Sequence, residues 1–135
     1  MKTTARYLGG LRFKVAVRGH QVVSDQPLEN KGEDAGISPP EFLLISLATC
    51  AGHYAMEYLK SRKLPVEGLT VEVSAEKLKG PARLGDFRIE VTAPDLPAGH
   101  ESMLLRAVRS CLIHNPLMNP TVIETVIHAP VAAGN

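Results

Sequence analysis

The sequence lacks several features that mark common classes of protein. Its 135 residues include no tryptophan, only 4% aromatic residues and only two cysteines. The formal net charge is +1, and because basic residues form no run or cluster with aromatic ones, we expect no nucleic-acid partner. The longest stretch without a charged residue, Phe42 to Met56, is shorter than the roughly 20 residues of a membrane-spanning helix, so we expect no membrane partner.

The beginning of the chain also lacks a signal for secretion. Residues 1–10 contain no apolar run of the kind that a signal peptide needs, which predicts a cytoplasmic protein with reduced thiols. The hydrophobic fraction of 44% and the charged fraction of 21% are those of an ordinary globular protein. We therefore expect one domain that spans residues 1–135.

The N-terminal region predicts a small antiparallel sheet followed by a loop. Apolar residues alternate with others from Leu11 to Val17, which is the period of a half-buried strand. Weaker strands are expected from Thr3 to Leu8 and from Gln21 to Ser24. The stretch from Asp25 to Ile37 has almost no apolar residues, so it predicts an exposed connection of a length that is often functional.

A long helix is predicted to begin just after this loop. Ser38 suits the N-cap, Pro39 the first helical position, and Glu41 completes a Ser-x-x-Glu capping box. We expect the helix to run to about Arg62. Because apolar residues occupy nearly all of its faces, a single sheet cannot cover it, and other helices or a second subunit must.

The remaining sequence predicts a hairpin, a second helix and a final strand, which gives an α+β fold with the order ββ(β)-α-ββ-α-β. Cys111 lies on the apolar stripe of the second helix, which Asn115 and Pro116 are expected to end. The predicted segments are strands from Leu69 to Glu76 and from Phe87 to Thr92, a helix from about His100, a strand from Thr121 to His128 and a frayed tail from Ala129 to Asn135.

The two cysteines are the strongest candidates for chemistry, and each is followed three residues later by a histidine, as Cys50 with His53 and Cys111 with His114. Both thiols occupy inward-facing positions of predicted helices, so the sulfur atoms could approach disulfide distance although 60 residues separate them. This arrangement favours redox chemistry. The alternative is that both are inert core residues, which is the usual role of a buried free cysteine.

A reactive cysteine must ionise, and a neighbouring cation favours the thiolate. The candidates are Arg12 and Arg18, which share one strand face, and His53, one helical turn beyond Cys50. The arginines could instead form a solvated outer face, and His53 could be a hydrogen-bonded core residue. Glu41 is best explained by its cap, although a carboxylate at that position could also orient an arginine.

Three other interpretations of the cysteines stay open. The paired spacing permits a structural zinc site with Cys50, His53, Cys111 and His114 as ligands. A cysteine hydrolase is a weaker alternative, because no third orienting group or oxyanion loop accompanies the thiols. The third is a dimeric ligand-binding module whose cysteines only fill its core.

Almost the whole chain, from Gly9-Gly10-Leu11-Arg12 to the last predicted strand, resembles a known family. The sequence Ser-Pro-Pro-Glu-Phe-Leu-Leu-Ile-Ser-Leu-Ala-Thr-Cys from Ser38 to Cys50, with a second cysteine at 111 followed by Asn-Pro, is similar to the osmotically inducible protein C and organic hydroperoxide resistance (OsmC/Ohr) family. The resemblance implies an OsmC-like fold, in which antiparallel sheets enclose long central helices in an intertwined homodimer. It also implies an oxidoreductase of the oxidative stress response that needs no cofactor or metal.

The same resemblance implies roles for individual residues. Cys50 matches the peroxidatic cysteine, Cys111 the resolving one, and Arg12 the arginine that stabilises the thiolate and contacts peroxide. The family's catalytic glutamate falls on Pro40, so Glu41 is displaced by one residue. Glu41, Arg18 and His53 are then expected to contribute to substrate binding. The expected partners are an organic hydroperoxide and a small dithiol or protein thiol that reopens the disulfide.

Overall fold

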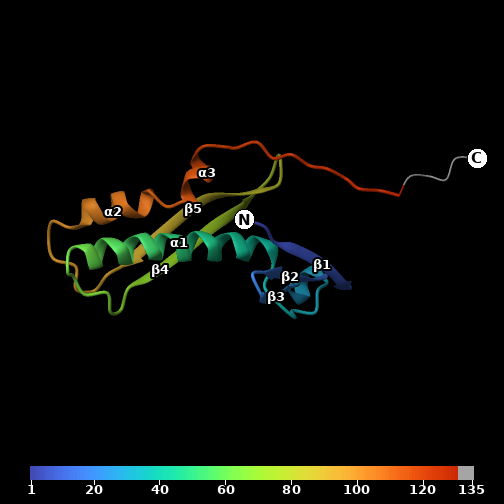
Figure 1. The fold of residues 1–135 in the computed structure, drawn as a ribbon, viewed down its shortest axis with the longest axis horizontal. Helices are drawn as coiled ribbons and strands as arrows, with labels where there is room; N and C mark the ends of the chain where they lie inside the picture. The colour runs from blue at the N-terminus through green and yellow to red at the C-terminus, as the bar shows by residue number, and fades with distance from the viewer. Residues whose placement is uncertain (131–135) are drawn as a thin grey trace, which may run out of the picture.

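The structure is a computed structural model, and it describes residues 1–130. It combines two antiparallel sheets with helices, which confirms the predicted α+β class (Figure 1). The strands are β1 (Thr4–Gly9), β2 (Arg12–Val17), β3 (His20–Ser24), β4 (Thr70–Leu78) and β5 (Arg83–Thr92). The helices are η1 (Leu28–Asn30), α1 (Pro39–Ser61), α2 (Glu101–Arg109) and α3 (His114–Met118).

The N-terminal meander forms as predicted, in the strand order β1-β2-β3. Tyr7 lies opposite Phe13, and their rings pack with centroids 5.7 Å apart. This places apolar side chains on one face of the sheet, yet Tyr7, Phe13 and Val22 stay exposed. The chain by itself therefore does not cover the apolar face of this sheet.

Helix α1 begins with the predicted capping arrangement. The backbone N–H and the hydroxyl of Ser38 both donate to Glu41 Oε2, at 2.7 and 2.8 Å. The first of these bonds gives the backbone N–H of the N-cap residue a partner. Proline fits at the first helical position because the first N–H groups of a helix have no partner within the helix. The predicted end at about Arg62 is one residue beyond the observed end at Ser61.

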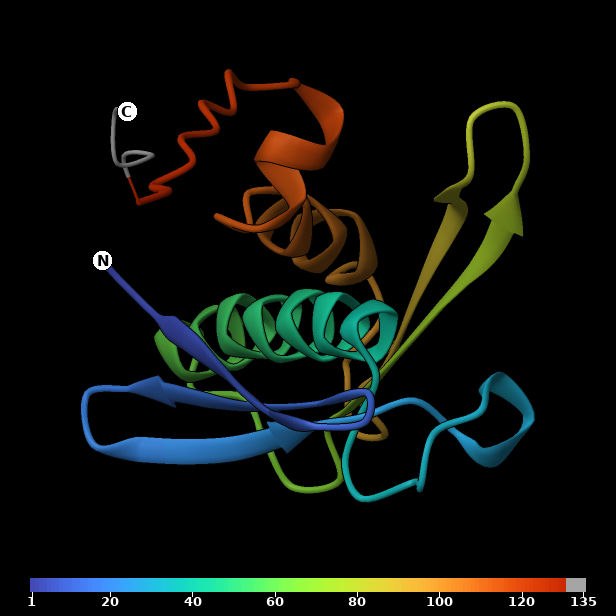
Figure 2. The same ribbon diagram turned by 90° about the vertical axis from the view of Figure 1, so that its right-hand side faces the viewer.

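The core lies where α1 packs against α2 and the β4-β5 hairpin. Figure 2 shows α2 stacked alongside α1 and the hairpin extending away from them, and the N-terminal sheet lies near the first turns of α1 in Figure 1. Ala51 and Ala55 of α1 are fully buried against Leu104 and Val108 of α2. Alanine at these positions allows the two helices to approach closely, and that approach brings Cys111 to α1.

This close packing gives a first prediction, because Ala55 has no exposed surface. Replacing Ala55 with leucine adds three carbon atoms to a filled interface, which should lower the free energy of unfolding by about 1–3 kcal/mol. It should also slow disulfide formation between Cys50 and Cys111, since α2 must shift away. Denaturant unfolding measures the first effect; Ala82→Leu, in the exposed hairpin turn, is the control. An unchanged unfolding midpoint for Ala55→Leu would contradict this packing argument.

The second helix is shorter than predicted and a further helix follows it. Helix α2 ends at Arg109, where the Ser110 hydroxyl donates to the backbone oxygen of Arg106 at 3.1 Å, a side-chain bond that competes with helix continuation. Pro116 does not end α2 but lies in the first turn of α3, where proline costs no hydrogen bond. Cys111 nevertheless faces the core, as predicted, from the turn between the helices.

The predicted final strand from Thr121 to His128 is wrong for the single chain. The structure has no strand there, and the segment leaves the other elements beyond α3 (Figure 1). A strand requires a neighbouring strand for its hydrogen bonds, and none lies beside this segment in the part of the chain that is described. Val122 and Ile123 are 96% and 87% exposed. Of the predicted frayed tail, residues 131–135 lie outside the described residues.

None of the helices in residues 1–130 has the length and apolar character needed to cross a membrane.

Candidate functional site

The two thiols lie together at the junction of α1 and the turn after α2. Cys50 is half-buried on α1, Cys111 is 0% exposed, and neither is in a disulfide. The turn is held by a 3.2 Å hydrogen bond from the Cys111 N–H to the backbone oxygen of Val108. The side chain of Cys50 lies close enough to that of Cys111 to act on its pKa, so the two thiols are neighbours. Two residues with 60 others between them in the sequence thus form one dithiol site.

The environment of Cys111 favours its protonated form. Burial raises the pKa of the Cys111 thiol, and the neighbouring Cys50 side chain raises it further. The backbone N–H groups of His114 and Ile113 act in the opposite direction but do not reverse the shift. Cys111 therefore keeps its proton at neutral pH.

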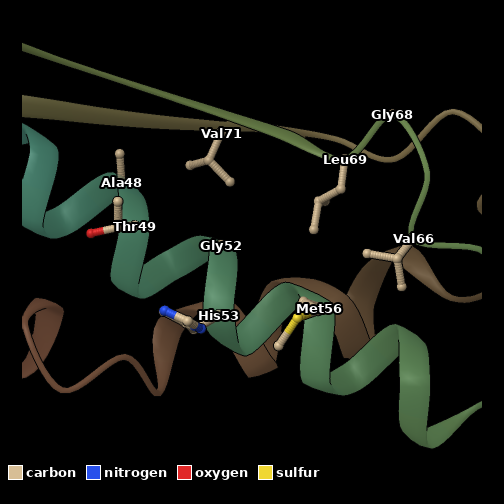
Figure 3. A pocket seen from close by; sticks show the side chains of 9 residues that line it. All are labelled: Ala48, Thr49, Gly52, His53, Met56, Val66, Gly68, Leu69 and Val71. Atoms are coloured by element: carbon tan, nitrogen blue, oxygen red, sulfur yellow. The ribbon is translucent and has the colours of Figure 1, made fainter.

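The two histidines do not join the thiols in a metal site. His53 is exposed and lines a groove of about 470 Å³ between α1 and the start of β4, with Met56 from the same helix and Leu69 and Val71 opposite (Figure 3). His114 lines a different groove, between β5 and α2. Within residues 1–130, no three His, Cys, Asp or Glu side chains are grouped to hold a metal ion, so the four-ligand zinc arrangement does not form.

The two candidate arginines lie in different parts of the N-terminal sheet. Arg12, at the start of β2, points to the loop after β3, where its Nη1 lies 3.2 Å from Glu33 Oε2. Arg18 occupies the exposed β2-β3 turn with a φ of 48°. In residues 1–130 of a single chain, no ion pair or hydrogen bond joins either arginine to Cys50. Their predicted roles at the thiol remain predictions.

The Glu41 side chain takes part in the helix cap. The hydrogen bond from the backbone N–H of Ser38 is the main cause that lowers the pKa of the Glu41 carboxyl, and the bond from the Ser38 hydroxyl is the second cause. Glu41 is therefore ionised at neutral pH. Both bonds end on the same oxygen and bind the side chain to its own helix. The predicted capping role is confirmed, and the predicted substrate-binding role stays untested.

Sequence reasoning missed Asp25, which organises the whole loop from 25 to 37. Its side chain is 1% exposed, and its carboxylate accepts N–H bonds from Gln26, Glu33 and Ala35 at 2.8, 3.0 and 3.0 Å. The loop is therefore tightly structured around a buried charge. The signal available in the sequence was an aspartate directly after a strand, a residue that commonly bonds to nearby backbone N–H groups.

The buried carboxylate makes the loop sensitive to acid. The N–H of Ala35, with those of Gln26 and Glu33, lowers the pKa of Asp25, and burial only partly opposes this. A lowered pKa in the folded state gives stability that is present above the unfolded-state pKa and is lost as the pH falls through the folded value. Thermal unfolding should therefore occur at lower temperature below about pH 4.

Asp25→Asn should be less stable than wild type near neutral pH and should lose part of this acid dependence. Asp95→Asn, on an exposed loop, should leave the pH profile unchanged. Thermal melting followed by circular dichroism across the acid range measures both. Identical profiles for wild type and Asp25→Asn would refute the role of the carboxylate.

Comparison with known proteins places the chain in a family. The family model described as OsmC-like protein matches residues 32–126. The chain belongs to the OsmC-like protein family. This confirms the resemblance found in the sequence, and the family includes hydroperoxide resistance proteins. A search of curated proteins found no match.

Solved structures of OsmC-like proteins share the fold. An OsmC-like protein from Mycoplasma pneumoniae is 18% identical, with a TM-score of 0.74 over 88% of this chain and 87% of that chain. An organic hydroperoxide resistance protein OsmC from Legionella pneumophila is 20% identical, with a TM-score of 0.66 over 88% and 90%. The organic hydroperoxide resistance protein OhrB of Bacillus subtilis is 20% identical, with a TM-score of 0.64 over 88% and 90%.

Proposed function

We propose that this OsmC-like protein is a cytoplasmic, cofactor-free thiol peroxidase that reduces organic hydroperoxides. The observation that carries the proposal is that the Cys50 and Cys111 side chains are neighbours, although they come from distant parts of the sequence. One of these thiols is half-buried and the other fully buried. A thiol that peroxide can reach, beside a protonated thiol that it cannot reach directly, suits a peroxidatic and a resolving role.

The reaction would proceed in two steps. The Cys50 thiolate attacks one oxygen of the hydroperoxide, the O–O bond breaks, and the leaving alkoxide takes a proton to become an alcohol. Cys50 is then a sulfenic acid. The Cys111 sulfur attacks it, a disulfide forms, and the hydroxyl leaves as water with the proton of the Cys111 thiol. A dithiol or protein thiol supplies two electrons and two protons to restore both thiols.

Arg12 is the cation that we propose for the thiolate. A guanidinium can donate parallel hydrogen bonds to a thiolate and to a peroxide oxygen, which lowers the energy of the charge that develops during O–O cleavage. In one chain Arg12 lies at the start of β2, next to Phe13 and therefore on the opposite face of the sheet, where it pairs with Glu33. The assignment thus depends on an assembly that brings the start of β2 to a cysteine helix.

A homodimer would supply this assembly. The exposed apolar face of the N-terminal sheet, the groove of about 470 Å³ along α1 and the unpaired segment from 121 to 128 are three apolar surfaces that one chain leaves uncovered. Exposed patches of this extent usually mark interfaces. A second copy would cover them and provide a sheet edge for the C-terminal segment. Light scattering should give twice the mass of one chain.

The test of the proposal is steady-state consumption of peroxide with dithiothreitol as the reductant. Because Cys111 belongs to the buried apolar core, cumene hydroperoxide should be consumed faster than hydrogen peroxide. No consumption of either compound above the uncatalysed rate would overturn the proposed function.

A second candidate function rests on the groove between β5 and α2. It has a volume of about 430 Å³ and is lined mainly by apolar side chains, together with Glu101, Arg109 and His114. Such a groove could hold an apolar anion in a carrier protein. Binding of anilinonaphthalene sulfonate to both wild type and Cys50→Ser, without any peroxide consumption by wild type, would favour the carrier.

A further inference from the structure

The guanidinium of Arg12 forms an ion pair with the carboxylate of Glu33. Arg12 Nη1 lies 3.2 Å from Oε2 of Glu33, in the loop after β3. The carboxylate that sequence reasoning considered for this purpose, Glu41, is bound to Ser38 instead. Among the described residues, Glu33 is the acid that forms an ion pair with Arg12.

The backbone fixes the position of Glu33 independently of its side chain. Its N–H donates to Oδ2 of the buried Asp25 at 3.0 Å. On either side, Gly32 and Gly36 pass so close to other backbone atoms that an added Cβ would lie 1.8 and 2.0 Å from backbone oxygens. The loop is thus built to hold one backbone geometry, and Glu33 projects from it toward Arg12.

Arg12 keeps donors free after it pairs with Glu33. Its Nε is buried and has no hydrogen-bond partner in residues 1–130. A buried N–H without a partner is uncommon and costs free energy unless something else accepts from it. The guanidinium is planar, so a carboxylate on one nitrogen fixes the direction of the others. Glu33 therefore orients Arg12 while the Nε–H of Arg12 is still available to donate a hydrogen bond.

The ion pair between Arg12 and Glu33 is too exposed to contribute much to the stability of the fold. The side chains of Arg12 and Glu33 are 35% and 65% exposed, and ion pairs in such positions stabilise folded proteins little. The loop does not need Glu33 for its structure either, because Asp25 and the glycines hold its backbone. Orientation of Arg12 is the effect that remains.

We propose that Glu33 is a positioning residue that sets the guanidinium of Arg12 for the Cys50 thiolate and the peroxide. The proposal rests on the proposed function of Arg12. In this proposal the loop from 25 to 37 supplies the carboxylate of Glu33, and the buried Asp25 holds the backbone of that loop in place. Glu33 itself touches neither substrate nor thiol.

The test compares Glu33→Ala with Glu29→Ala, which removes the same charge from the same loop but breaks no ion pair of the described residues. Glu33→Ala should lower kcat/KM for cumene hydroperoxide about tenfold, with an unchanged melting temperature. Glu33→Asp should recover part of the loss, and Glu29→Ala should match wild type. In an Arg12→Gln background, Glu33→Ala should cause no further loss, because the two residues act as one unit.

Nuclear magnetic resonance of the arginine Nε–H groups gives a readout that does not require peroxidase activity. The Arg12 signal should be sharp in wild type and Glu29→Ala and lost by solvent exchange in Glu33→Ala. If wild type is active and Glu33→Ala is equally active, the positioning role of Glu33 is overturned, but the proposed peroxidase function is not. An inactive wild type would instead overturn the peroxidase, and a sharp Arg12 signal in Glu33→Ala would then show that Glu33 does not hold Arg12 either.

Discussion

Replacing Cys50 with serine is expected to abolish the reduction of organic hydroperoxides. A serine hydroxyl does not ionise at neutral pH, so it cannot replace a thiolate as the nucleophile. The rate of cumene hydroperoxide consumption should fall by about a thousandfold or more, as for other lost nucleophiles. The fold should be unaffected, because Cys50 is only half-buried and serine is of similar size.

The matched variant Cys111→Ser should behave differently in a single turnover. Without a reductant, the first equivalent of peroxide should be consumed at the wild-type rate, because Cys111 acts only in the second step. Repeated turnover should then stall, since Cys50 cannot form its disulfide. Stopped-flow measurement of peroxide loss separates the two steps. Equal activity of Cys50→Ser and wild type would show that the thiols are core residues only.

Replacing Arg12 with glutamine is expected to have the second largest effect. The loss of a charged donor from the developing negative charge should lower kcat/KM by about 100-fold. Arg18→Gln removes the same charge from an exposed turn of the same sheet and should change kcat/KM by less than about twofold. Steady-state kinetics of both variants decides which arginine serves the thiol.

Arg12→Lys refines this comparison, because it keeps the charge but loses the planar set of donors. Partial recovery, below wild type, is expected if orientation matters as well as charge. A large loss for Arg18→Gln together with normal kinetics for Arg12→Gln would reverse the assignment.

Local signals in the sequence were enough for most of the fold. The capping box at Ser38 and Glu41 placed the start of α1 correctly, and alternation placed the meander and the hairpin. These features depend on residues that are near one another in the chain. The apolar stripe of α2 likewise predicted that Cys111 faces the core, although the helix itself ends earlier, at Arg109.

Features that depend on contacts between distant segments could not be predicted in this way. The pairing of Arg12 with Glu33 joins residues on either side of a strand and a structured loop, and composition alone made that loop appear merely exposed. Asp25 is buried because its carboxylate meets three backbone N–H groups, a geometry that no periodicity reveals. The strand expected from 121 to 128 lacks a neighbour within the described chain, so apolar sequence alone did not make it a strand.

The packing of α1 against α2 links the fold to the proposed chemistry. Ala51 lies next to Cys50 in sequence, and Val108 lies one turn before Cys111. The packing of Ala51 against Val108 therefore influences the distance between the two thiols. Small residues on α1 keep that distance short, which is why a change at Ala55 should affect both stability and disulfide formation.

The most direct measurement is mass spectrometry of peptides from protein treated with one equivalent of cumene hydroperoxide, digested without reduction. Wild type should give a peptide pair joined by an intramolecular Cys50–Cys111 disulfide, and Cys111→Ser should give a trapped sulfenic acid at Cys50. Unmodified thiols in both proteins would contradict the proposed function.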